Sequence, residues 1–126
     1  MSRTTILLLV TDLMFHSRIE AAAAGLAIDV KTPPNDEAAL GAIATGPNAV
    51  VIDLHDTAFD AQRLIAQASA AGVPILAFGR HTEPQTLRGA REAGAGLVVP
   101  RSQLVDELPS LLERLVASST APADSP

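Results

Sequence analysis

The sequence predicts an α/β fold, a three-layer αβα sandwich around a five-stranded parallel sheet of order 2-1-3-4-5. Short apolar runs recur along the chain, segments with helical spacing follow them, and glycine or proline punctuates the boundaries. A strand–helix order repeated five times favours parallel strands joined by right-handed crossovers. In the expected order the first and third strands are neighbours at the point where the winding reverses, which is where α/β sheets bind ligands.

Five segments have the composition of strands. Residues 49–53 read AVVID, a short apolar run that ends in a carboxylate, and such a run is typical of a strand buried on both faces. Residues 27–31 alternate apolar and polar side chains, as a strand near the sheet edge does. Pro74 fits the start of a strand, where a missing N–H is tolerated. The strands are expected at 4–10, 27–31, 49–53, 73–78 and 95–99.

Helical spacing between these runs predicts the crossover helices. Phe15, Ile19 and Leu26 recur at helical intervals, and glycine marks the end of that helix. Pro109 belongs in the first turn of a last helix that ends near residue 117, because proline breaks a helix interior. Other helices are expected from a cap at Asn35 or Asp36 to residue 44, from Thr57 or Asp60 to residue 71, and from about Glu83.

Composition limits the classes of function. The 126 residues, 48% of them hydrophobic, suit one domain, expected at 1–117, and the small polar residues of 118–126 predict a disordered tail. The absence of cysteine excludes disulfides and thiolate chemistry. A net charge of −5 without a basic cluster argues against nucleic acid as partner. No run is long enough for a membrane span and no signal peptide is visible, so we expect a cytoplasmic protein.

Two acidic residues follow buried strands. Asp12 comes after the first strand and Asp53 ends the third. Because the carboxyl ends of parallel strands meet at one edge, we expect the two carboxylates to face each other across one crevice. A buried carboxylate without a partner is costly, so Asp53 is not expected to be an ordinary core residue. The alternative to a functional role is a solvated strand end whose carboxylate caps the next helix.

The ordered motifs resemble the receiver domain of two-component response regulators, a flavodoxin-like fold. The resemblance covers about residues 5–116. ILLLVTD is similar to the first strand and its acidic pair, VVID to the phosphoacceptor strand, VPILAFG to the fourth strand, LRGAREAGAG to the helix and turn before the fifth strand, and VVPR to the strand that ends in the family's lysine.

The resemblance implies roles for particular residues. Asp53 would be the phosphoacceptor, and Mg²⁺ would be held by Asp12, Asp53 and the backbone carbonyl of His55. Gly79 and Arg101 would stand at the phosphate-binding positions. The implied partner is a protein, either a histidine kinase or a downstream target, and Mg²⁺ is the only implied cofactor. Carboxylates suit that ion because Mg²⁺ prefers oxygen ligands.

Three of the five positions that carry the chemistry of the family depart from its pattern. Thr11 replaces the first acid of the pair, Gly79 replaces a hydroxyl residue, and Arg101 replaces the lysine. Arginine retains the charge but is larger and planar, so it is not equivalent. We therefore favour an atypical, stand-alone receiver, a pseudo-receiver that acts through protein docking without the ordinary phosphorylation switch and is not an enzyme.

Other interpretations remain open at the level of sequence. One alternative is a phosphoacceptor regulator that takes a phosphoryl group on Asp53 from a histidine kinase with Mg²⁺. A second is a small-ligand-binding α/β domain that uses the same crevice. Met14 and Phe15, at the start of a helix beside the acidic site, are candidate docking residues, with Met14 the one expected to point outward. The alternative is that residues 13–15 belong to the core at the start of that helix. A homodimer is a further arrangement that the sequence leaves open.

Overall fold

The computed structural model, which describes residues 3–120, contains a five-stranded sheet in which every pairing is parallel. The strand order is β2-β1-β3-β4-β5, so the predicted fold class and strand order are confirmed. β1 and β3 lie side by side, with Leu9 opposite Ile52 in the register. The strands are β1 (Thr5–Leu9), β2 (Asp29–Lys31), β3 (Ala49–Asp53), β4 (Ile75–Gly79) and β5 (Leu97–Pro100).

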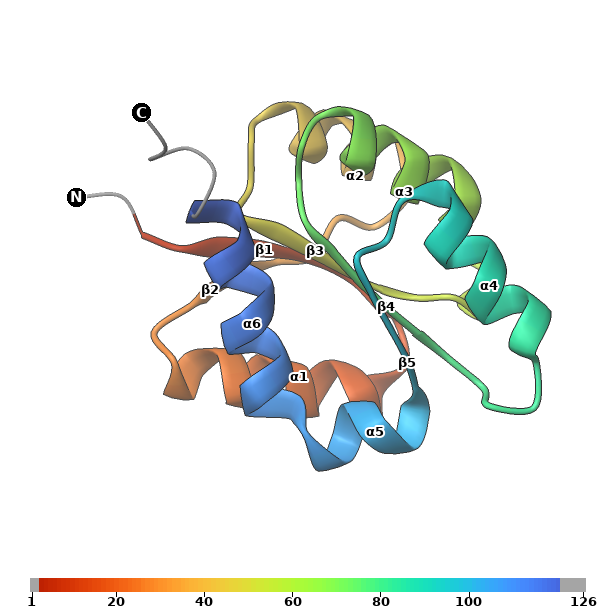
Figure 1. Cartoon of the computed structure of the whole chain (residues 1–126). Helices are drawn as coiled ribbons and strands as arrows, with labels where there is room; N and C mark the ends of the chain where they lie inside the picture. Colours follow the sequence, from red (N-terminus) through yellow and green to blue (C-terminus); the bar gives the residue numbers. More distant parts are fainter. Residues whose placement is uncertain (1–2, 121–126) are drawn as a thin grey trace.

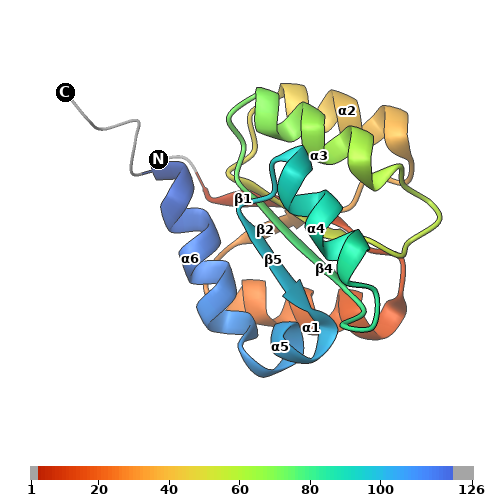
Figure 2. The ribbon, with the colours of Figure 1, turned by 45° about the vertical axis from the view of Figure 1, so that its right-hand side comes forward.

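Helices cover both faces of the sheet (Figure 1). α1, α5 and α6 lie on one side and α2, α3 and α4 on the other, and the turned view separates the two layers in the same way (Figure 2). In residues 3–120 none of the helices combines the length and the apolar composition needed to cross a bilayer. The helices are α1 (Leu13–Gly25), α2 (Asp36–Ala44), α3 (Ala61–Ala70), α4 (Pro84–Ala93), α5 (Arg101–Asp106) and α6 (Leu108–Thr120).

The central strands feed two separate apolar cores because successive side chains point to opposite faces. In β3, Ala49 and Val51 pack with α1 and α6, whereas Val50 and Ile52 pack with α2 and α3. β1 and β4 divide their side chains in the same manner. The apolar runs of the sequence therefore reflect burial on both faces, as expected for a central parallel strand.

Side-chain caps fix where several helices begin. Asn35 caps α2 by accepting the Ala38 N–H, and Asp60 caps α3 by accepting the Arg63 N–H. These are one of the two predicted cap candidates in each case. Pro109 is the second residue of α6, in the predicted first turn, where its missing N–H breaks no helical hydrogen bond.

All strands except β3 have bounds that differ by one or two residues from the prediction, and three boundary differences have a visible cause. β2 begins at Asp29 because Ala27 has a φ of 58°, which no strand residue adopts. The predicted last helix is preceded by the short helix α5. The helical conformation is interrupted between the two helices at Glu107. α6 continues to Thr120, past the expected tail start at residue 118, because its buried leucines anchor it to the sheet. The rest of the expected tail, 121–126, lies outside the described residues.

Candidate functional site

Asp12 and Asp53 line one cavity of about 260 Å³ at the carboxyl edge of the sheet. Asp53 is the last residue of β3, and Asp12 follows β1, the adjacent strand. The prediction that the two carboxylates share one crevice is therefore confirmed. The other lining residues come from the segments that follow β1, β3 and β5, and are Thr11, His55, Asp56, Thr57 and Arg101.

Asp53 is the one buried charged residue in the part of the chain that the structure describes. Its exposed fraction is 3%, and its Oδ1 accepts the His55 N–H at 2.9 Å. Nη2 of Arg101 lies 3.7 Å from the same oxygen, which makes an ion pair. A charge removed from water needs such partners, because an uncompensated buried carboxylate is strongly destabilising.

Arg101 reaches Asp53 from the first residue of α5, directly after β5. Its guanidinium carbon lies 5.3 Å from the centroid of the Phe15 ring, a cation–π distance. The Phe15 ring lies in turn 5.3 Å from the ring of Phe78. Nε of Arg101 is buried and has no hydrogen-bond partner within residues 3–120. The guanidinium is therefore held between an aromatic ring and a carboxylate, with donor capacity left over.

The position of the missing acid, Thr11, is tied to another carboxylate. Asp56 Oδ2 accepts both the Thr11 N–H, at 2.6 Å, and the Thr11 hydroxyl, at 2.8 Å. Asp56 Oδ1 accepts the Ala58 N–H. Asp12 is the N-cap of α1 and accepts the N–H groups of Met14 and Phe15 through Oδ1. The acidic residues of the cavity therefore also shape the loops that carry them.

The His55 ring lies over Gly79, the last residue of β4. A Cβ atom built on Gly79 would stand 2.9 Å from Nε2 of His55. Nε2 accepts the N–H of Arg80 at 2.9 Å. Gly79 is not among the residues that line the cavity, so its expected role in phosphate binding stays a prediction.

The docking residues named from the sequence separate into one exposed and one buried side chain. Phe15 is only 8% exposed and packs under Arg101, so the prediction that it joins a docking surface is wrong. Met14 is 60% exposed and points outward as expected, and Leu13 is 82% exposed. Leu13 and Met14 form an apolar pair at the first turn of α1, beside the cavity.

The three residues that the resemblance implies as magnesium ligands all line the cavity, and their binding of the ion stays a prediction. Mg²⁺ is commonly bound by one or two carboxylates with water completing its octahedral shell. Asp12, Asp53 and the His55 carbonyl are compatible with such a set, although Arg101 already provides a positive charge there. Over residues 3–120, no three Asp, Glu or His side chains are arranged so that they alone could hold a metal ion.

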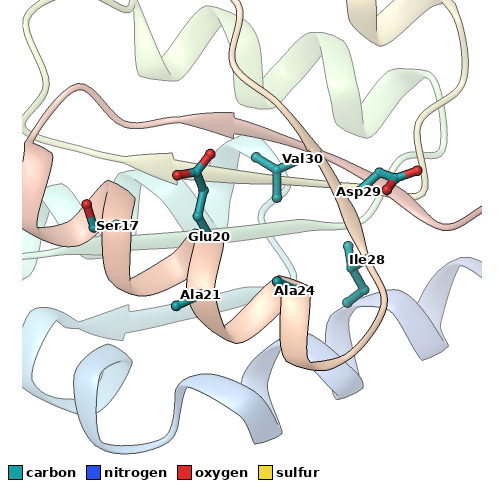
Figure 3. A pocket seen from close by; sticks show the side chains of 7 residues that line it. All are labelled: Ser17, Glu20, Ala21, Ala24, Ile28, Asp29 and Val30. Atoms are coloured by element: carbon teal, nitrogen blue, oxygen red, sulfur yellow. The ribbon is translucent and has the colours of Figure 1, made fainter.

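A second hollow, of about 510 Å³, lies between α1 and β2 and is shallow and open (Figure 3). Its two carboxylates, from Glu20 and Asp29, lie apart in the close-up view. Each is already paired, Glu20 with His16 at 3.5 Å and Asp29 with Arg3 at 2.7 Å. The remaining lining side chains are small or apolar, so this hollow has no group of side chains suited to catalysis.

Sequence reasoning missed three contributions to the site. Asp56 and the ring of His55 stand in the D-x-H-D stretch after β3, but sequence spacing alone does not identify Thr11 and Arg80 as their partners. Leu13 was one of three consecutive apolar residues, of which at least one had to face outward. Phe15 is the one of the three that is buried, because it packs in the apolar core against Phe78.

Comparison with solved structures identifies the fold. NtrX of Brucella abortus superposes with a TM-score of 0.82 at 17% identity over 98% of this chain, which spans 29% of the NtrX chain. A putative response regulator of Chloroflexus aurantiacus gives 0.78 at 21% identity, over 92% of this chain and 99% of that one. The chain has the receiver fold. No protein-family profile and no curated protein sequence matches it.

A third neighbour with the receiver fold contains a metal ion. The receiver domain of the sensor histidine kinase PA1611 of Pseudomonas aeruginosa superposes with a TM-score of 0.76 at 19% identity, over 92% of this chain and 99% of that domain. Magnesium is coordinated in its active-site cleft. The expectation that Mg²⁺ is a possible cofactor of this chain is consistent with that neighbour.

The contacts of Asp56 generate a stability prediction. Replacing Asp56 by alanine removes the acceptor of the Thr11 N–H, the Thr11 hydroxyl and the Ala58 N–H. We expect the free energy of unfolding to fall by about 1–3 kcal/mol in a urea titration, because these partly exposed groups regain water only in part. The control is Glu113→Ala, at an exposed site on α6, which should change stability by less than about 0.5 kcal/mol. Equal stability of the two variants would contradict this role of Asp56.

Proposed function

We propose that this chain is a receiver-like signalling domain that acts by docking a partner protein and does not run the ordinary phosphorylation switch. The observation that carries the proposal is the ion pair between Arg101 and Asp53. It places a cation of the chain itself beside the carboxylate that the receiver fold would use as phosphoacceptor.

The Phe15 ring makes this cation hard to displace. A guanidinium that faces an aromatic ring is stabilised there by about 0.5–2 kcal/mol, depending on how far it is desolvated. The side chain of Arg101 is 30% exposed and that of Asp53 is 4% exposed, so water screens their attraction less than at an open surface. A phosphoryl group on Asp53 would have to share this space with the planar guanidinium, which is larger than an ammonium.

Thr11 supports the same proposal. It replaces an acidic residue of the receiver pattern, and its hydroxyl donates to Asp56. The position therefore supplies no negative charge of its own to attract a divalent cation. Lower affinity for Mg²⁺ would weaken phosphoryl transfer, since the ion neutralises the charge of the phosphoryl oxygens.

The exposed pair Leu13 and Met14 supports docking to a protein. Large apolar side chains that remain exposed side by side are favourable contacts for a protein partner. The net charge of −5 disfavours nucleic acid as that partner. The receiver fold is shared with a sensor kinase domain and with response regulators, so the proposed partner is a histidine kinase or a downstream target.

A second candidate function is phosphoacceptance on Asp53. It is favoured by the buried Nε of Arg101, which has no acceptor within the described residues and could donate to a phosphoryl oxygen. In this case the carboxylate of Asp53 would attack the phosphorus of a phosphohistidine, forming an acyl phosphate and releasing the histidine. Asp12, Asp53 and the His55 carbonyl would hold the Mg²⁺, which supplies charge neutralisation.

Intact-mass spectrometry after incubation with acetyl phosphate and Mg²⁺ distinguishes the two functions. We expect the wild-type protein to gain no phosphoryl group, because Arg101 already neutralises the carboxylate. An established receiver domain treated in parallel checks the reagent. A gain of one phosphoryl group that is absent from Asp53→Asn would overturn the proposal in favour of phosphoacceptance.

The docking half of the proposal has its own test. Immobilised wild-type protein and Asp53→Asn should retain the same partner from a lysate, whereas Leu13→Ser/Met14→Ser should lose it by at least about tenfold. Far-UV circular dichroism and the melting temperature check that the double variant remains folded. Retention that needs Asp53, or that survives loss of both apolar side chains, would count against docking through this pair.

A further inference from the structure

His55 occupies space that other side chains at position 79 would need. Its side chain is 11% exposed, and Nε2 stands 2.9 Å from the place of a Cβ on Gly79. Leu54 Cδ1 approaches the same place to 3.4 Å. The side chains of Leu54 and His55 therefore fill the space next to Gly79 at the end of β4. Only glycine fits beneath the ring without moving it.

The ring also holds the start of the connection between β4 and α4. Nε2 accepts the Arg80 N–H at 2.9 Å, which places the ring proton on Nδ1. Nδ1 lies 3.5 Å from Arg80 Nη1 and 4.0 Å from Glu83 Oε2, and Arg80 Nη1 donates to that oxygen at 3.2 Å. The Glu83 N–H donates to the Arg80 carbonyl, closing the turn over residues 80–83. Both the N–H and the carbonyl of Arg80 are therefore hydrogen-bonded at the start of this turn.

The backbone of His55 is attached to the acidic site. Its N–H donates to Asp53 Oδ1 at 2.9 Å, while its ring contacts the neighbouring strand end. One residue thus connects the carboxylate of β3 with the turn after β4. β3 and β4 are paired neighbours, and Asp53 lies opposite Phe78 in the register.

We propose that His55 is a positioning residue that locks the turn after β4, and that Gly79 is its matched partner. The ring occupies the space that a side chain at position 79 would need, and its Nε2 accepts the hydrogen bond of the Arg80 N–H. The turn over residues 80–83 is consequently held in one conformation whether or not a group is bound at Asp53. This inference concerns the turn alone. The lock can fail while the proposed docking function holds, and docking can fail while the lock holds.

Nuclear magnetic resonance of the wild-type protein tests the lock directly. An N–H···N hydrogen bond transmits a scalar coupling between its two nitrogens, so we expect a resolved ¹⁵N–¹⁵N coupling between the Arg80 amide and His55 Nε2. The Arg80 amide should also exchange with solvent at least about tenfold more slowly than in His55→Ala. The matched control is His81→Ala, at an exposed histidine on the same turn, which should leave Arg80 unchanged. Absence of the coupling together with rapid exchange would overturn the lock.

A double-mutant cycle tests the matching of His55 and Gly79. Gly79→Ala should lower the folding equilibrium constant in the wild-type background, because its Cβ displaces the ring and breaks the Arg80 hydrogen bond. In the His55→Ala background the same substitution should be better tolerated, with a coupling on the order of tenfold. The control is Gly96→Ala, where an added Cβ meets nothing within 4 Å and should be additive with His55→Ala. Additive effects at Gly79 would overturn the matched pair.

Discussion

The buried carboxylate of Asp53 is the constraint on which the rest of the site depends. It ends a strand that is apolar on both faces, and its exposed fraction is 3%. A charge in such a place has to be compensated, and the chain does so with the His55 N–H and the guanidinium of Arg101. The parallel order β1-β3-β4-β5 brings all of these groups to one edge. The fold thus provides the cavity, and the identity of the cation distinguishes this site from the receiver pattern.

Each departure from that pattern has a neighbour in space that accommodates it. Thr11 lacks the expected carboxylate, and its N–H and hydroxyl are bound by Asp56. Gly79 lacks a side chain, and the ring of His55 covers it. Arg101 is larger than lysine, and Phe15 supports its guanidinium. Thr11, Gly79 and Arg101 therefore each have a specific packing or hydrogen-bonding neighbour, and these contacts support the proposal that the site does not run the ordinary phosphorylation switch.

The sequence predicted the three-layer arrangement of helices and sheet well, because strands buried on both faces appear in the sequence as short apolar runs. Apolar runs such as 49–53 specified the central strands, and the repeated strand–helix order specified a parallel sheet. It predicted the side chains less well. The orientation of Phe15 depends on Arg101 and Phe78, which are distant in sequence, and the role of the His55 ring depends on the backbone of residue 80. Contacts of this kind follow from the folded arrangement and leave no periodic pattern in the sequence.

The measurement that tests the central claim most directly is a titration with beryllofluoride and Mg²⁺, followed in the amide spectrum. Beryllofluoride mimics a phosphoryl group on a carboxylate without requiring a donor. If the ion pair with Arg101 prevents Asp53 from accepting the reagent, the amide signals of residues 53–56 stay in place as the reagent is added. Saturable shifts of those signals that disappear in Asp53→Asn would contradict the account, since they would mean that the carboxylate accepts an incoming group despite its ion pair.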